Sequence, residues 1–336
     1  MFRKKLLIKV LLWVSVVVFF CTQVSMAETQ MPVVRLTEVV HSIFYTPQYI
    51  ALSNNYFEEE GIKVELSTAW GGDKAAASLM AGATDIALIG PEPTIYVYQR
   101  GAENYIVNFA QLTNTAGSFL LAREPMPDFK WEDVKGKTII GNRPGGAPQM
   151  VLEYVLKTRN IIPGKDVEVI TNLDFKANAG AFIGGLGDFV QLFEPNASLL
   201  ELKKQGYIVA SLGTSGGELP YTVYMARVNY IKKNPDIIQA FTNAIYRAQQ
   251  WVHSHNVEEI VTKIKPYFPD TDEDILLSVV KRYKEQGTWD TNPVIEKEIF
   301  EKYEEIIIMA GELEEKAPFD VLVNNKFAHN AIENIQ

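Results

Sequence analysis

Cysteine and histidine are scarce in this sequence: among its 336 residues there are four histidines and one cysteine, Cys21. No Ser/His/Asp or Cys/His order, no Walker loop and no metal-ligand spacing is visible, so no nucleophile is paired with a base. His253 and His255 are close in sequence, but no carboxylate motif accompanies them, and we expect both at the surface. We therefore expect no metal and no cofactor, and we do not expect an enzyme.

Basic residues are outnumbered by acidic ones, with 32 Lys and Arg against 41 Asp and Glu. Four of the basic residues lie in segment 1–27, which has no acidic residue, so the rest of the chain has 28 basic and 41 acidic residues and a net charge of −13. Such an acidic chain is poorly suited to nucleic acid or to an anionic membrane surface. We expect no nucleic-acid partner.

Residues 1–27 have the pattern of a secretory signal peptide: a basic start, a largely apolar run over 6–20, and small residues at Ser25 and Ala27. Cleavage after Ala27 would leave a chain without cysteine, which excludes disulfides and thiolate chemistry. An uncleaved membrane anchor and a lipidated Cys21 are the alternatives. We expect an exported protein, periplasmic or extracytoplasmic, either free or attached to the membrane through its N-terminus.

One sequence pattern occurs twice. A Gly-x-x-Asp turn precedes an apolar strand at Asp85 and again at Asp188, 103 positions later. Pro47 and Pro148 each open a predicted helix, 101 positions apart. Matched α/β units at a nearly constant offset indicate two similar lobes, and a cleft between two lobes is a usual place for a small-molecule ligand.

Strands alternate with helices in both halves, which predicts an α/β fold of two doubly wound lobes with mainly parallel sheets and right-handed crossovers. Two short apolar strands, at 119–123 and 223–227, both close in Ala-Arg and are the expected hinge crossings. The first lobe is then 33–119 plus 227–336, and the second is 120–226. We expect the C-terminal helices to pack on the first lobe.

Loops at the carboxyl ends of the strands are the expected ligand-binding positions in such sheets. Glu92 and Glu194 follow matched strands, each as a Glu-Pro pair. They would accept hydrogen bonds from ligand amines, or they would only satisfy local donors and shape turns. Gly145 and Gly146, beside Arg143, would bring backbone N–H groups close to an anionic or carbonyl group, or form a plain turn.

Aromatic side chains near these loops are candidates for flat walls against a ligand ring. Phe44, Tyr45 and Trp70 lie in the predicted loops, and Tyr221 is the fourth candidate. Such residues pack in a protein core more often than they line a ligand site. We expect about half of them to face the cleft.

Four segments together resemble the ABC-transporter solute-binding proteins of the branch that covers sulfonates, nitrate, taurine and thiamine pyrimidine precursors. They are residues 56–64, residues 71–86, residues 136–139 and residues 193–197. The resemblance covers most of the chain beyond the signal peptide. It is specific for the family and weak for the ligand.

The resemblance implies a type II periplasmic-binding fold that closes on a small-molecule solute and delivers it to an ABC permease in the membrane, acting as a monomer. The ligand contacts that it implies are His41, Tyr45, Trp70, Gly71, Gly72, Glu92, Thr113, Gly145, Gly146 and Glu194. The predicted loops add Asn114 and Arg143, and the aromatic candidates add Tyr221.

The expected solute is a small nitrogen-containing, ring-bearing molecule like a thiamine pyrimidine precursor, because an acidic cleft favours amine donors over anions such as nitrate. An alkyl sulfonate, taurine or nitrate is the alternative for the same receptor role. An exported enzyme like the fungal pyrimidine synthase is the alternative of another class. That enzyme is marked by a cysteine-rich motif, which this chain lacks, and His41 with Glu92 is the only titrating pair that we can propose for it.

Overall fold

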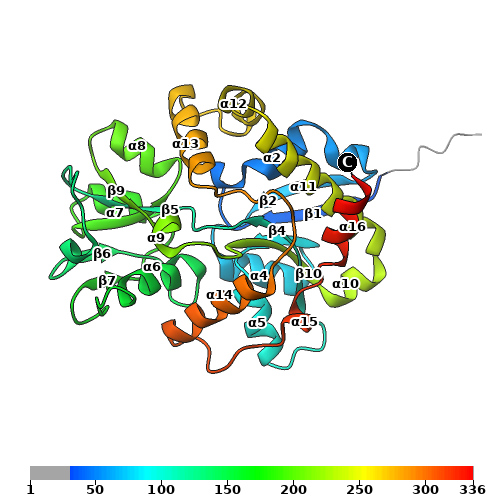
Figure 1. Ribbon diagram of the computed structural model, residues 1–336, viewed down its shortest axis with the longest axis horizontal. Helices are drawn as coiled ribbons and strands as arrows, with labels where there is room; N and C mark the ends of the chain where they lie inside the picture. Colours follow the sequence, from blue (N-terminus) through cyan, green and yellow to red (C-terminus); the bar gives the residue numbers. More distant parts are fainter. Residues whose placement is uncertain (1–30, 336) are drawn as a thin grey trace, which may run out of the picture. The chain divides into compact units, whose positions relative to one another are not determined.

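The computed structural model describes residues 31–335; the predicted signal peptide and Cys21 lie outside them. The compact unit Pro32–Gln336 contains two five-stranded sheets (Figure 1). The first sheet has the strand order β2-β1-β3-β10-β4. Its strands are β1 (Val33–Glu38), β2 (Lys63–Thr68), β3 (Ile86–Ile89), β4 (Ile106–Thr113) and β10 (Thr222–Arg227).

The second sheet repeats this arrangement with the order β7-β6-β8-β5-β9. In each sheet the first three strands are parallel and the fourth, β10 or β5, is antiparallel to both of its neighbours. The prediction of two similar α/β lobes is confirmed. The strands are β5 (Ser118–Ala122), β6 (Thr138–Ile140), β7 (Glu168–Ile170), β8 (Phe189–Phe193) and β9 (Tyr207–Ser211).

The repeated aspartate has the same structural role in both lobes. Asp85 Oδ2 accepts the backbone N–H of Arg35 at 3.0 Å, and Asp188 Oδ2 accepts that of Thr138 at 2.9 Å. Each aspartate thus fixes the start of one strand to the start of its neighbour. The repeat therefore reports on the fold and does not mark a ligand contact.

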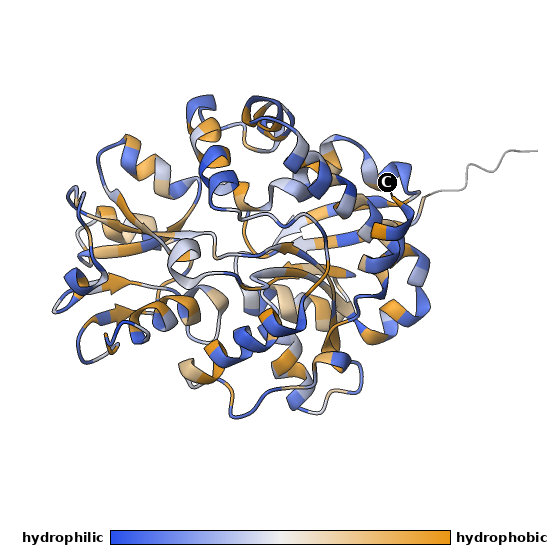
Figure 2. Ribbon diagram, viewed as in Figure 1, coloured by the Kyte–Doolittle hydropathy of each residue, from blue (hydrophilic) through white to orange (hydrophobic). Residues whose placement is uncertain are grey.

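The chain passes between the sheets twice, a few residues before the predicted crossings. Strand β5 begins at Ser118 in the second sheet, and β10 begins at Thr222 in the first sheet. The passages therefore lie at 114–117 and 212–221, and 222–226 belongs with the first lobe instead of the second. Both strands are buried and apolar (Figure 2 shows β5 largely in orange), so the sequence did not show to which sheet each belongs.

Short helices connect the strands of each lobe. Four of them, α2, α4, α5 and α6, begin at a glycine or have proline in their first turn. They are η1 (Ile43–Tyr45), α2 (Thr46–Ser53), α3 (Tyr56–Glu59), α4 (Gly72–Ala81) and α5 (Glu92–Gln99) in the first lobe, and η2 (Trp131–Val134), α6 (Ala147–Lys157), α7 (Asn178–Ile183), α8 (Asn196–Leu202) and α9 (Leu212–Gly216) in the second.

The helices after β10 contact both lobes. As predicted, α11 and α12 pack against α2, and α16 packs against β4. However, α13 contacts α8 and α14 packs against α6, so two of these helices also cover the second lobe. They are α10 (Val228–Lys233), α11 (Pro235–Ser254), α12 (Val257–Ile264), η3 (Lys265–Tyr267), α13 (Glu273–Glu285), α14 (Lys297–Ala310), α15 (Phe319–Leu322) and α16 (Lys326–Asn334).

Candidate functional site

Loops at the carboxyl ends of the parallel strands of both lobes meet at one interface. Ser42 follows β1 and Glu194 follows β8. The Ser42 hydroxyl donates to the backbone carbonyl of Glu194 at 2.6 Å. Ala147 follows β6 and Glu92 follows β3. The backbone N–H of Ala147 donates to Glu92 Oε1 at 3.3 Å. The structure therefore brings together the loops that the strand-end rule selects, with Glu92 and Glu194 both buried in the interface.

Glu92 is the first residue of α5, and its carboxylate reaches the other lobe. Its Oε1 accepts the N–H of Ala147, the first residue of α6, and its Oε2 accepts the Tyr303 hydroxyl of α14 at 2.8 Å. Burial raises the pKa of this carboxyl, against the effect of these hydrogen bonds. A Cβ on Gly90 would lie 2.1 Å from Glu92 Oε2, so only glycine leaves room for the carboxylate.

Tyr221 contributes a buried hydroxyl to the interface, where its ring packs against Phe44. The side chain is 2% exposed, and its hydroxyl has no hydrogen bond of good geometry within residues 31–335, although the Ser118 hydroxyl lies near it. Burial, and after it the negative charge of Glu92, raises the pKa of this phenol far above its usual value. It therefore stays neutral and can donate or accept one hydrogen bond.

Glu194 is held entirely by protein groups. Its Oε2 accepts the N–H of Ser198 at 2.9 Å, and its Oε1 accepts the Ser198 hydroxyl at 2.9 Å and pairs with Arg282 from α13. Burial raises the pKa of Glu194, and Arg282 and Ser198 oppose that effect. The carboxylate thus caps α8 and links the second lobe to α13.

An aromatic cluster spans the interface around Phe44. The Phe44 ring centroid lies 5.8 Å from that of Phe193 in the second lobe and 5.7 Å from that of Tyr221. The Tyr45 ring packs behind it, 5.4 Å away and almost fully buried. Gly117 is required here, since a Cβ at this position would lie 2.3 Å from the Phe44 ring.

Trp70 lies at the more exposed edge of the interface and meets a cation from the other lobe. The ammonium group of Lys176 stands 4.1 Å from its ring centroid, a cation–π contact. Beside it, Arg143 bridges Asp73 of the first lobe, at 3.3 Å, and Asp174 of the second. Trp70 has φ 59°, which is unusual for a bulky residue and is typical of functional loops.

His41 belongs to a structural network. Its Nδ1 bonds to Glu38 Oε1 at 2.9 Å and its Nε2 to the Tyr267 carbonyl at 2.8 Å. The hydrogen bond to Glu38 raises the pKa of His41 more than burial lowers it. Its ring stacks on Phe268, 4.7 Å between centroids. His41 thus ties the first sheet to the C-terminal helices, and both of its ring nitrogens have protein partners.

The remaining predicted residues lie along the same interface with different neighbours. Thr113 is buried and shares hydrogen bonds with Thr222 in β10. The carbonyl of Gly145 accepts the Tyr96 hydroxyl of α5 at 3.1 Å, which is a further hydrogen bond between the lobes. Four further residues complete the set: Gly71 and Gly146 precede α4 and α6, Gly72 opens α4, and Asn114 follows β4 with a buried Oδ1 that has no partner within residues 31–335.

Several interface residues were not predicted. Tyr303 and Arg282 come from helices that the sequence assigned to the first lobe alone, and no local pattern shows which turn of a helix reaches the interface. Lys176 and Phe175 lie in the loop between β7 and α7. Phe193 had a usable signal, because it ends β8 directly before Glu194.

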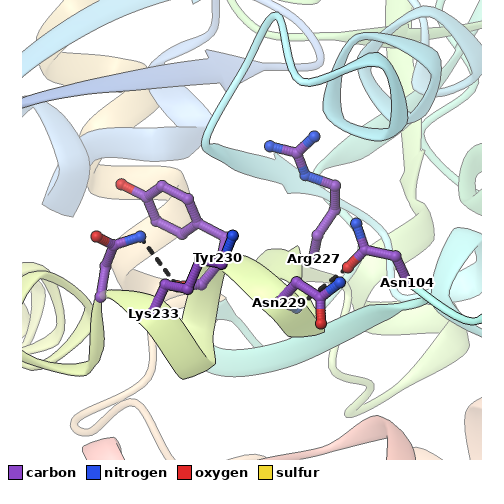
Figure 3. A pocket seen from close by; sticks show the side chains of 6 residues that line it. Asn104, Arg227, Asn229, Tyr230 and Lys233 are labelled. Carbon is purple, nitrogen blue, oxygen red and sulfur yellow. Dashed lines mark hydrogen bonds between the residues drawn. The ribbon is translucent and has the colours of Figure 1, made fainter.

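A separate cavity of about 270 Å³ lies at the opposite end of the first sheet (Figure 3). Arg227 pairs there with Ile106, where β4 starts, whereas Thr222 pairs with Thr113, where β4 ends near the interface. This cavity is therefore distinct from the inter-lobe site. Its lining residues are Asn104, Arg227, Asn229, Tyr230, Lys233 and Asn234.

Within residues 31–335, no group of three or more His, Cys, Asp or Glu side chains is arranged to hold a metal ion. None of the helices in this range combines the length and the apolar character needed to cross a membrane.

Comparison with known sequences gives a family and a relative. Residues 43–259 match the family model described as NMT1/THI5 like. The Bacillus subtilis (strain 168) protein named "Putative binding protein YtlA" is 46% identical over 314 residues, which covers 94% of each chain.

Comparison with solved structures gives the fold. The alkanesulfonate-binding protein SsuA of Xanthomonas axonopodis pv. citri, bound to MOPS, has a TM-score of 0.70 at 14% identity over 87% of this chain and 98% of that one. The periplasmic nitrate-binding protein NrtA of Synechocystis PCC 6803 has a TM-score of 0.71 at 16% identity, over 91% and 90%. The desulfurization enzyme DSZB has a TM-score of 0.64 at 12% identity, over 90% and 100%. The chain therefore has the periplasmic-binding fold, which hosts binding proteins and also an enzyme.

Proposed function

The chain belongs to the NMT1/THI5-like family, and on this basis we propose that it is an extracytoplasmic solute-binding receptor of an ABC importer. It captures a small molecule between its lobes and delivers it to a membrane permease, acting as a monomer. The binding-protein name of the relative with 46% identity supports this role, as do the names of structures with the same fold.

The observation that carries the proposal is the interface itself. Groups from both lobes meet there, with Glu92 reaching Ala147 and Phe44 reaching Phe193. A solute held between such groups contacts both lobes only when they are closed. Binding therefore shifts the population toward the closed state, which is what a permease must distinguish.

The solute that we propose is small, contains nitrogen and bears a ring. Glu92 is a hydrogen-bond acceptor, Tyr221 has a free hydroxyl, and Phe44 and Phe193 offer aromatic faces. Amine or amide hydrogens match Glu92, and a flat ring matches the aromatic cluster. Trp70, with its cation–π contact to Lys176, borders the same region.

An alkyl sulfonate, taurine or nitrate is the alternative solute, in view of the SsuA and NrtA structures.

An enzymatic role has less support here. His41 is hydrogen-bonded to Glu38, and Glu92 to Tyr303, so the one titrating pair that the sequence offered is not assembled. We propose that the chain is not an enzyme.

Mass spectrometry of the solute that co-purifies, followed by thermal-shift screening of aminopyrimidines, flavin-like rings and sulfonates, tests the proposal. We expect ring compounds with amino groups to raise the melting temperature and to be recovered unchanged. Stabilisation by taurine or alkyl sulfonates alone would refute the ring-bearing solute and keep the receptor role. Turnover of a bound compound would refute the receptor role in favour of an enzyme.

A further inference from the structure

We propose that the cavity at the far end of the first sheet is a second binding site, and that it takes a phosphate group, as free phosphate or on a small phosphomonoester. The site goes beyond the proposed receptor role and does not depend on which solute the lobes hold. Its two cations are Arg227, at the end of β10, and Lys233, in the last turn of α10 (Figure 3).

The guanidinium group of Arg227 has a donor that the rest of the described chain does not use. Its Nε is buried and has no hydrogen-bond partner within residues 31–335. The group lies against Gly82, at the C-terminal end of α4, where a Cβ would be 2.6 Å from Nη1. This helix end attracts the cation, but Arg227 forms no ion pair in the same range of residues. A buried donor without an acceptor is unfavourable, and a ligand oxygen would remove that cost.

The matched arginine of the other lobe has a purely structural role. Arg123 follows β5 as Arg227 ends β10, and both strands close in Ala-Arg. Arg123 Nε donates to the Gly187 carbonyl at 2.8 Å. Its Nη2 donates to the carbonyls of Phe182 at 3.0 Å and of Leu186 at 2.7 Å. The backbone thus uses the donors of Arg123, whereas the Nε of Arg227 has no such partner among the described residues.

The cavity has positive charge in an acidic protein. None of its six lining residues is acidic, and Lys233 is a second cation without an ion pair in the part of the chain that the structure describes. The charge of Asp85 reaches Tyr230, but Arg35 holds both oxygens of this carboxylate, at 2.9 Å and 2.6 Å. Two cations without carboxylate partners suit a doubly charged phosphate better than a singly charged carboxylate.

Neutral groups add hydrogen-bond donors to the lining. Burial, and after it the charge of Asp85, raises the pKa of Tyr230 to about 12, so its phenol is protonated and can donate. Asn104 Oδ1 accepts the backbone N–H of Asn229 at 3.1 Å, which leaves the Nδ2 of Asn104 as a donor. The several oxygens of a phosphate group can accept from both cations and from these donors at once.

Isothermal titration with inorganic phosphate, glycerol 3-phosphate and acetate at low ionic strength tests the proposal. We expect wild type to bind inorganic phosphate with a dissociation constant of about 1 mM or lower, and acetate about tenfold more weakly. An affinity for glycerol 3-phosphate about tenfold above that for phosphate would identify an ester as the ligand, and equal affinities the free anion; either supports the site.

Lys233→Gln should weaken phosphate binding about fivefold or more, because the cavity loses one of its two cations. Lys233 is exposed, so the folded structure should tolerate this change. Lys232→Gln is the matched control: it removes the same charge from the same helix, but Lys232 does not line the cavity. We expect the control to change the affinity less than about twofold.

Arg227→Gln should abolish phosphate binding, and Trp70→Ala should leave it unchanged because Trp70 lies at the inter-lobe interface. Four results would overturn the proposal: folded wild type that binds no phosphate at millimolar concentration, equal weakening by Lys232→Gln and Lys233→Gln, acetate that binds as tightly as phosphate, or a loss in Trp70→Ala as large as in Lys233→Gln. If Arg227→Gln does not fold, the comparison of the two lysine variants decides alone.

Discussion

The Tyr303 hydroxyl on α14 donates a hydrogen bond to the Glu92 carboxylate on α5, 211 positions away in the chain, at a distance of 2.8 Å. Both side chains are buried. A residue of the C-terminal helices thus orients the carboxylate that the first lobe presents to the second.

Replacing Tyr303 by Phe should destabilise the protein, because the buried Glu92 carboxylate loses the hydroxyl that donates to it and keeps only backbone donors. We expect a loss of about 1–3 kcal/mol in the free energy of unfolding, measured by urea denaturation at pH 8. Tyr98→Phe is the control, since Tyr98 is half-buried and its hydroxyl makes no hydrogen bond within residues 31–335. Equal losses in the two variants would contradict the role of Tyr303.

Glu304 should make stability depend on pH near neutrality. Burial raises the pKa of this carboxyl to about 7, and its Oε1 accepts the N–H of Ala317 at 2.8 Å. Since the folded pKa lies above the unfolded one, the folded protein binds more protons between pH 4.5 and 7 and gains stability as pH falls through this window. We therefore expect Glu304→Gln to be more stable than wild type by about 1–3 kcal/mol at pH 8 and equal to it near pH 4.5. A difference that does not change between these two pH values would show that Glu304 is charged or neutral throughout.

His41 should also make stability fall as pH rises, in a window that begins at a higher pH than that of Glu304. Its pKa is raised, first by the hydrogen bond to Glu38, so its stabilising effect is complete below the unfolded pKa and is lost as pH rises through the folded pKa. His41→Gln is then expected to cost more stability at pH 5.5 than at pH 9. An NMR titration of His41 should have its midpoint above that of a free histidine, and Glu38→Gln should lower that midpoint. No movement in Glu38→Gln would disprove the pairing.

Gly117 should be intolerant of a side chain because of Phe44. Its Cβ would lie 2.3 Å from the Phe44 ring, so Gly117→Ala must displace the ring that contacts the second lobe. We expect a loss of about 1–3 kcal/mol and weaker solute binding. Gly180→Ala in α7 is the control, because no atom lies within 4 Å of that Cβ, and we expect a gain of about 0.5–1 kcal/mol. Similar melting temperatures for the two variants would contradict the packing argument.

The lobes and the interface loops were predictable because both depend on local patterns. The Asp85 and Asp188 repeat gave the duplicated fold, and strand ends gave the loops that meet. The different states of Glu92 and Glu194 were not predictable. Their sequence contexts match, and the difference comes from Arg282 and Tyr303, which only the packing of α13 and α14 brings to the two carboxylates.

The crossings were misplaced for a similar reason. An apolar strand such as β10 shows that it will be buried, but not in which sheet. The contact between Trp70 and Lys176 was not predictable either, since Lys176 belongs to the other lobe and lies far from Trp70 in the sequence.

The strand orders also set the sequence in which the lobes can be completed during synthesis. All strands of the second sheet lie within 118–211, so this lobe is an uninterrupted insertion in its host. The first sheet lacks the strand between β3 and β4 until 222–227 has been made. The sheet of the inserted lobe is therefore complete first, and the host sheet closes its gap only after the chain has returned from it.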